Sequence, residues 1–98
     1  LPGVLVTLAE EKGWTEEQCV MGLLAGSAVG VIIGRYASFS GSVAGCQVEV
    51  GSASAMAAAA IVEGAGGSPR QVVDAASVAI QNLMGLICDP VQGYVEIP

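Results

Sequence analysis

Apolar and small residues recur along the chain at the spacing of helices. Residues 45–61, GCQVEVGSASAMAAAAI, contain no lysine, arginine or aromatic residue and are rich in alanine, the strongest helix former. Because the side chains are small on every side, this segment predicts a helix against which other helices pack closely. We therefore expect the fold to be organised around it.

Start and stop signals predict three further helices. Residues 2–13 begin with proline and end with glycine, the usual asymmetry of a helix. A second helix starts at the capping box of residues 15–18, TEEQ, and extends to about Arg35. A last helix starts at residues 68–71, SPRQ, and keeps a 3.6-residue apolar period as far as Met84.

The remaining segments lack a helical period. Residues 36–44 read as a connection, and residues 85–98 as an extended or turning loop, since they combine Asp-Pro with glycine and a short alternation. The expected fold class is all-α. It is a bundle of about four helices around a central Ala/Gly-rich helix, with an irregular C-terminal loop, in a single helical domain over residues 1–98.

Glycine recurs every four residues in the second predicted helix, at Gly22, Gly26, Gly30 and Gly34. Each glycine costs roughly 0.5–1 kcal/mol relative to alanine in a helix, so a compensating contact is expected. Close approach of the alanine-rich helix would supply it. A membrane helix is the alternative, but the uncharged stretch 20–34 has 15 residues, fewer than the roughly 20 needed to span a bilayer.

Composition narrows the function. Hydrophobic residues make up 53% of the 98 residues and charged residues 12%, which suggests a piece of a larger protein or one side of an assembly. The net charge of −6 argues against nucleic acid and against a membrane surface as partners. Without histidine the chain cannot form a His-based triad or His-ligated zinc, and three cysteines favour a reducing, cytoplasmic compartment over a disulfide framework.

Two cysteines are candidates for chemistry. Cys46 opens the alanine-rich helix, where the helix dipole and free N–H groups favour a thiolate, either a nucleophile or a metal ligand. Cys88 follows the last predicted helix. A helix out and a helix back would bring the two thiols to the same end of a hairpin, which is compatible with a metal. Two separate structural thiols are the alternative.

Two charged residues have a structural and a chemical interpretation. Glu49, three residues after Cys46, suits a first-turn carboxylate that complements the helix dipole, with a catalytic acid as the alternative. Lys12 is the only lysine able to form a Schiff base, but its polar surroundings favour a solvated helix end.

Three stretches of the sequence carry a resemblance to a known family: ASFSGSVAGCQVEVGSASAMAAAA, GGSPRQV and MGLICDPVQGYVEIP. They closely resemble the α-chain region of the bacterial iron–sulfur L-serine dehydratases, also called L-serine ammonia-lyases. The similarity extends from Gly34 onward and, more loosely, over the first third. It implies a fragment of the α region, inactive alone, whose partners are the remainder of that region and a β domain or β subunit in an oligomer.

The resemblance also implies a cofactor. In that family three cysteines hold a 4Fe-4S cluster, and they match Cys46, Cys88 and a position just beyond Pro98. Cys19 matches no ligand and is expected to be a buried core thiol. The resemblance identifies no catalytic base among these residues.

Three thiolates leave one iron with an open position, which suits a Lewis acid that activates the hydroxyl of L-serine for elimination to pyruvate and ammonia. Two alternatives are a related iron–sulfur lyase acting on L-cysteine and a non-catalytic helical structural fragment.

Overall fold

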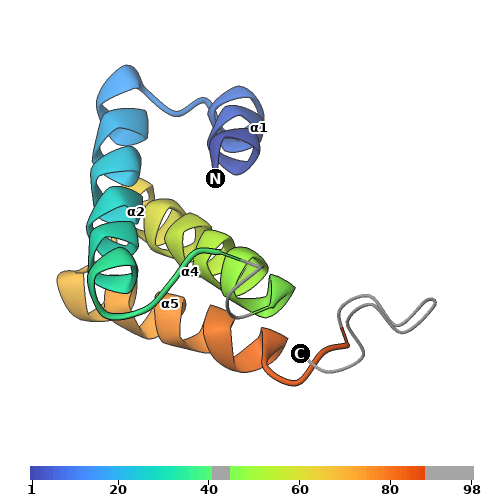
Figure 1. Cartoon of the computed structure of the whole chain (residues 1–98). Coiled ribbons are helices and arrows are strands. Elements are labelled where there is room, and N and C mark those ends of the chain that lie inside the picture. Colours follow the sequence, from blue (N-terminus) through green and yellow to red (C-terminus); the bar gives the residue numbers. More distant parts are fainter. Residues whose placement is uncertain (41–44, 88–98) are drawn as a thin grey trace.

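The computed structural model describes residues 1–40 and 45–87, and all regular structure in these ranges is helical. The helices are α1 (Pro2–Lys12), α2 (Glu16–Tyr36), α4 (Cys46–Gly64) and α5 (Pro69–Leu83), as Figure 1 shows. The all-α prediction is confirmed, and each helix lies close to its expected bounds. The expected C-terminal loop is described only as far as Ile87.

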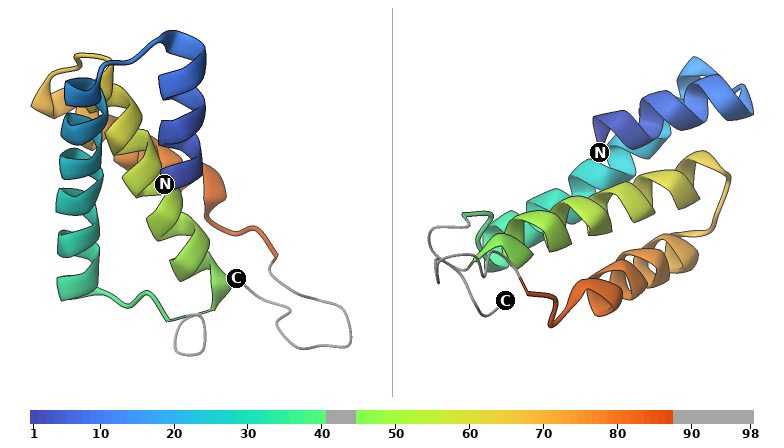
Figure 2. Two further views of the ribbon diagram at one scale, coloured as in Figure 1. Left: turned by 90° about the horizontal axis from the view of Figure 1, so that it is seen from above. Right: turned by 90° about the vertical axis from the view of Figure 1, so that its right-hand side faces the viewer.

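Helix α4 is the central element, as predicted. It contacts α1, α2 and α5, and Figure 2 shows it lying between α2 and α5. Its buried positions are small: Gly51, Ser52, Ala55, Ala59, Ala60 and Gly64. Because these side chains occupy so little space, the neighbouring helices approach the α4 backbone itself.

The glycine stripe of α2 forms the closest of these contacts. A Cβ atom built at Gly22 would lie 2.9 Å from the carbonyl oxygen of Ala60, and one at Gly26 would lie 3.0 Å from that of Met56. Gly22, Gly26 and Gly30 are all buried, so the predicted packing on the alanine-rich helix is confirmed for these three. Gly34 differs, because a Cβ there would meet the ring of Phe39.

The predicted capping box of α2 is formed, α5 also begins with one, and the box of α2 connects two helices. The Thr15 hydroxyl accepts a hydrogen bond from the Gln18 amide at 3.2 Å, and the Gln18 side chain accepts one from the Thr15 amide at 2.8 Å. Gln18 Nε2 also donates to the carbonyl oxygen of Gly64 at 3.1 Å. The start of α2 therefore lies at the end of α4, and the two helices run antiparallel.

Helix α2 is longer than the uncharged stretch that the sequence suggested. It has 21 residues, and its most apolar 18-residue window has a mean hydropathy of 1.6. Among the described helices it alone is long and apolar enough to cross a membrane by length and composition, so the argument that the segment is too short is wrong. Core helices of soluble proteins pass the same test, and its glycine face packs on α4.

Candidate functional site

Gly45 sets the direction in which the chain enters α4. Its backbone angles, φ 86° and ψ 168°, lie in a region that is essentially restricted to glycine. The helix starts at the next residue, Cys46, and the N-cap provides no side-chain hydrogen bond. By contrast, α2 and α5 both begin with a capping box. The positive end of the α4 dipole favours a negative group beside it, such as a thiolate.

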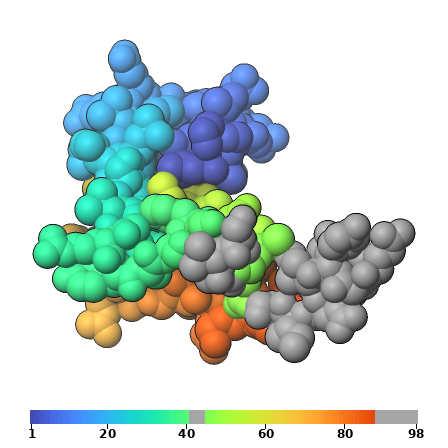
Figure 3. All heavy atoms as spheres, in the orientation of Figure 1, coloured from blue at the N-terminus to red at the C-terminus, as the bar shows by residue number. Residues whose placement is uncertain are grey.

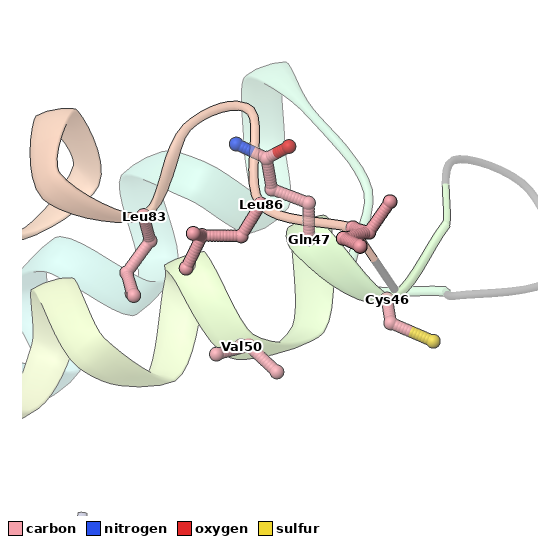
Figure 4. A pocket seen from close by; sticks show the side chains of 7 residues that line it. Cys46, Gln47, Val50, Leu83 and Leu86 are labelled. Carbon is pink, nitrogen blue, oxygen red and sulfur yellow. The ribbon is translucent and has the colours of Figure 1, made fainter. Parts of the chain in front are cut away.

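Cys46 lines a pocket of about 420 Å³ between the start of α4 and the end of α5. Figure 4 shows the side chains of Cys46 and Val50 leaving the same side of α4, one turn apart, while Gln47 points away from them. The described residues that line it are Cys46, Gln47, Val50, Gly51, Leu83, Leu86 and Ile87. Apart from the thiol and the Gln47 amide, these side chains are apolar, so the half-buried thiol has no charged side chain among the described residues of the lining.

The hairpin argument is confirmed for the sequence neighbours of the two cysteines. Cys88 itself lies outside the described residues, but Ile87, the residue before it, lines the same pocket as Cys46. The turn after α4 reverses the chain, and α5 returns along α4, so that Leu83 and Leu86 also reach the pocket. The structure therefore places the residues that precede Cys88, as far as Ile87, beside Cys46.

Cys19 lies at the other end of the molecule. It follows Gln18, whose side chain contacts Gly64 at the end of α4, whereas Cys46 starts the same helix. Nineteen helical residues correspond to roughly 27 Å along the axis. Cys19 is half-buried, so the expectation of a buried core thiol is not met in full, and in this arrangement Cys19 cannot join Cys46 at one site.

The two charged candidates have the positions expected from their structural interpretation. Glu49 lies in the first turn of α4 and is exposed. Lys12 lies in the last turn of α1 and is also exposed, away from the described pocket walls. Their places agree with a dipole-complementing carboxylate and a solvated helix end. Whether Glu49 takes part in chemistry stays a prediction.

A second pocket, which the sequence analysis missed, adjoins the first. It has a volume of about 230 Å³ and is bounded by α2, α4, α5 and residues 37 and 38. Gln47 and Gly51 line both pockets, and Ser52, 6% exposed, is the buried polar residue of the described chain. A polar residue on the buried side of an alanine-rich helix was the available signal, but the neighbouring surfaces that form the pocket are not visible in the sequence.

The described residues contain no group of three or more His, Cys, Asp or Glu side chains that could hold a metal ion. They contribute one thiol, Cys46, to the pocket, so any multi-thiolate site needs ligands from outside residues 1–40 and 45–87. The donor that is present suits iron, because a cysteine at a helix N-terminus favours the thiolate form that metals bind. The described residues therefore supply one ligand, Cys46, of a larger set that a metal group would need.

Comparison with known proteins identifies similar chains. A family model described as "Serine dehydratase alpha chain" matches residues 1–98. The alpha chain of a probable L-serine dehydratase from Bacillus subtilis (strain 168) is 49% identical over all 98 residues, and the L-serine dehydratase alpha chain of Peptoniphilus asaccharolyticus is 45% identical over the same length. An L-serine dehydratase of Streptomyces coelicolor is 50% identical over 86 residues.

The chain covers 33%, 34% and 19% of these three relatives, respectively, although it is itself matched over 100%, 100% and 88% of its length. It therefore spans about a third of the length of the two alpha chains named above. No solved structure matches the chain.

Proposed function

Because the chain belongs to the serine dehydratase alpha chain family, we propose that it is part of an enzyme that deaminates L-serine to pyruvate and ammonia. The names of the relatives support the substrate, since each is called an L-serine dehydratase. The proposed role of this segment is to supply two of three cysteine ligands to a 4Fe-4S cluster. These ligands are Cys46 and Cys88, and the third is a cysteine just beyond Pro98.

One observation carries this proposal. Cys46 is the first residue of α4, after the glycine N-cap Gly45, and it lines a pocket whose other wall is the chain that leads to Cys88. A structural thiol would need neither the glycine-only turn at Gly45 nor a pocket at its side. The end of a helical hairpin is a natural place for two thiolates from distant parts of the sequence to share one metal group.

When bound, a cluster with three thiolate ligands supplies an iron with an open position that acts as a Lewis acid on the substrate hydroxyl. The residues of this chain would hold and shield that group. The N-terminal end of α4 would stabilise the Cys46 thiolate, and the apolar side chains of Val50, Leu83 and Leu86, which line the pocket, would limit the access of water. In the overall reaction serine loses its α-proton and its hydroxyl as water, and hydrolysis of the resulting imine releases ammonia and leaves pyruvate.

The other parts of the enzyme belong to this proposal as well. A base for the α-proton and contacts to the substrate carboxylate are assigned to the remainder of the α region or to a β domain or subunit. The name "alpha chain" on several relatives implies such a partner. We place the assembled enzyme, an oligomer, in the cytoplasm, where thiolate ligands remain reduced.

The test compares two cysteine substitutions in the complete alpha chain. After anaerobic reconstitution with iron and sulfide, the unmodified chain is expected to bind iron and to show the broad visible absorption of a thiolate-ligated cluster. Cys46→Ser and Cys88→Ser should each lower iron content and absorption strongly. Cys19→Ser is the matched control and should leave both unchanged, because Cys19 lies at the opposite end of α4 from Cys46.

Two outcomes would count against the proposal. If Cys46→Ser retains the full iron content and absorption, Cys46 is not a ligand. If the reconstituted enzyme releases sulfide from L-cysteine faster than ammonia from L-serine at equal concentrations, the substrate is L-cysteine and the activity is that of a desulfidase.

A further inference from the structure

The outer face of α2 carries an apolar stripe that no described residue covers. Val20, Leu24, Ser27 and Val31 follow one another at i, i+4, i+7 and i+11, so they lie on one face of the helix. This face is opposite to the glycines that pack on α4. The side chains of Val20, Leu24 and Val31 are 47%, 59% and 70% exposed. We call these four residues the outer stripe; in Figure 3, α2 (light blue to green) forms one edge of the molecule.

Helix α5 provides an internal comparison, because it has an outer face at the same spacing. There, the four exposed positions at this spacing are polar, namely Arg70, Asp74, Ser77 and Gln81, although Val73 and Val78 beside them are 59% and 52% exposed. Arg70 and Asp74 also form an exposed ion pair at 3.2 Å. This is the normal pattern of a helix face in contact with water. The same fold therefore has one helix whose outer face suits water and one whose outer face does not.

The quantity of exposed apolar surface on α2 is large for a helix that remains in water. Only 17% of its most apolar 18-residue window is buried, and Leu23 and Ile32 beside the outer stripe are 44% and 60% exposed. Charged side chains occur only at the two ends of α2, at Glu16, Glu17 and Arg35. A continuous apolar face of this kind marks a contact surface.

We propose that the outer stripe is the docking face for an apolar helix from the remainder of the same alpha chain. The length of the relatives supports this occupant, because about two thirds of each of the two similar alpha chains lies outside the 98 residues. The small residues Ser27 and Ala28 at the middle of the face leave room for a helix to approach closely. The net charge of −6 and the acidic start of α2 oppose binding to an anionic bilayer.

This inference rests on the proposed function only in treating the segment as part of a longer alpha chain. It does not depend on the cluster, since the outer stripe faces away from α4 and its N-terminal thiol. Loss of iron on Cys46→Ser and protection of the outer stripe are therefore separate results, and either can fail without the other.

The experiment measures thiol labelling in the complete alpha chain, with Val31→Cys as the probe and Ser77→Cys as the matched control. Ser77 is exposed on the polar face of α5. Each variant is treated with a maleimide under native conditions and in denaturant, and the peptide carrying the new cysteine is quantified by mass spectrometry. We expect Val31→Cys to react at least about tenfold more slowly than Ser77→Cys in the native chain and equally fast in denaturant.

Three results would overturn the proposal. Equal native rates would show that the outer stripe is exposed. Protection that appears only when the β chain is added would assign the stripe to that partner. Protection that appears only with vesicles of zwitterionic and anionic lipid would assign it to a membrane. If Val31→Cys fails to fold, carbene footprinting of the unmodified chain gives the same readout at Leu24 and Ile32, with α5 as the reference.

Discussion

The close approach of α2 and α4 leads to a quantitative prediction for two alanine substitutions in the glycine stripe. A Cβ atom at Gly22 would lie 2.9 Å from the carbonyl oxygen of Ala60 and 3.2 Å from Cδ2 of Leu5. For a Cβ at Gly30, the three nearest atoms instead all belong to the side chain of Met56, with Cε at 2.8 Å. The backbone at Ala60 can yield only if a helix moves, whereas a methionine side chain can rotate away.

The difference between the two variants isolates this contact. Each substitution gains roughly 0.8–1 kcal/mol from the higher helix propensity of alanine. Forcing an extra methyl group into a tightly packed interface typically costs about 1–3 kcal/mol, and we expect this cost at Gly22 but not at Gly30. The free energy of unfolding of Gly22→Ala should therefore be lower than that of Gly30→Ala by about 1–3 kcal/mol.

The assay is urea unfolding of the complete alpha chain in its metal-free form, and far-ultraviolet circular dichroism monitors the loss of helix. Unchanged slopes with a lower midpoint for Gly22→Ala would agree with the prediction, since the slope reports the surface exposed on unfolding. Gly3→Ala is a suitable control, because a Cβ at this helical position meets nothing within 4 Å. Equal midpoints for Gly22→Ala and Gly30→Ala would refute the argument that the α4 backbone limits the approach.

Three further substitutions test other parts of the fold. Gly45→Ala should lower the free energy of unfolding by about 1–3 kcal/mol, because φ at this position is 86°. It should also lower the iron content, because it would turn Cys46 away from its pocket. An unchanged iron content would contradict this. Thr15→Ala removes the N-cap of α2 and should lower the free energy of unfolding by about 1 kcal/mol in the same urea assay. Gly64→Ala should clash with the ring of Trp14, and a double-mutant cycle with Trp14→Phe should reveal a coupling of about 0.5–3 kcal/mol, whereas additive effects would exclude the clash.

The helices were predictable from the sequence because their signals are local. Capping boxes, proline at a first turn and glycine after a last turn act within one or two helical turns, and α1, α2 and α5 begin where these signals stand. The packing of α2 on α4 was also predictable, since only small residues permit such a close approach of two helices. The contact of Gly34 with Phe39 was not, because it depends on the path of residues 37–40 after α2.

The candidate site was predictable in part. A thiol at the start of a helix and a hairpin that returns toward it follow from order along the chain, and Cys46 and Ile87 do line one pocket. The second pocket and the role of Gln47 in the walls of both pockets depend on how three helices pack, which no local pattern encodes. The apolar outer stripe of α2 was not singled out from the sequence, although burial of the glycine face, which was predicted, leaves this stripe on the outer side.

The two ends of α4 differ in how firmly they are held, and this difference leads to a last prediction. At the C-terminal end, Gln18 donates to Gly64 and the ring of Trp14 packs on the same glycine. At the N-terminal end, the N-cap residue is Gly45, which makes no side-chain hydrogen bond, and the first turn borders a pocket. Metal binding stabilises the structure that presents its ligands, so if the proposed cluster binds at Cys46, its removal should loosen mainly the N-terminal end.

Hydrogen exchange of the complete alpha chain, with and without its cluster, measures this effect. We expect faster exchange without the cluster in the first turns of α4 and in the last turn of α5, which together border the pocket. Amides of α4 near Gly64 and of α2 after its cap should exchange at unchanged rates, because their contacts involve no ligand. Equal acceleration at both ends would mean that α4 responds to the cluster as a single unit, and the separation of a rigid end from a ligand-dependent end would then be wrong.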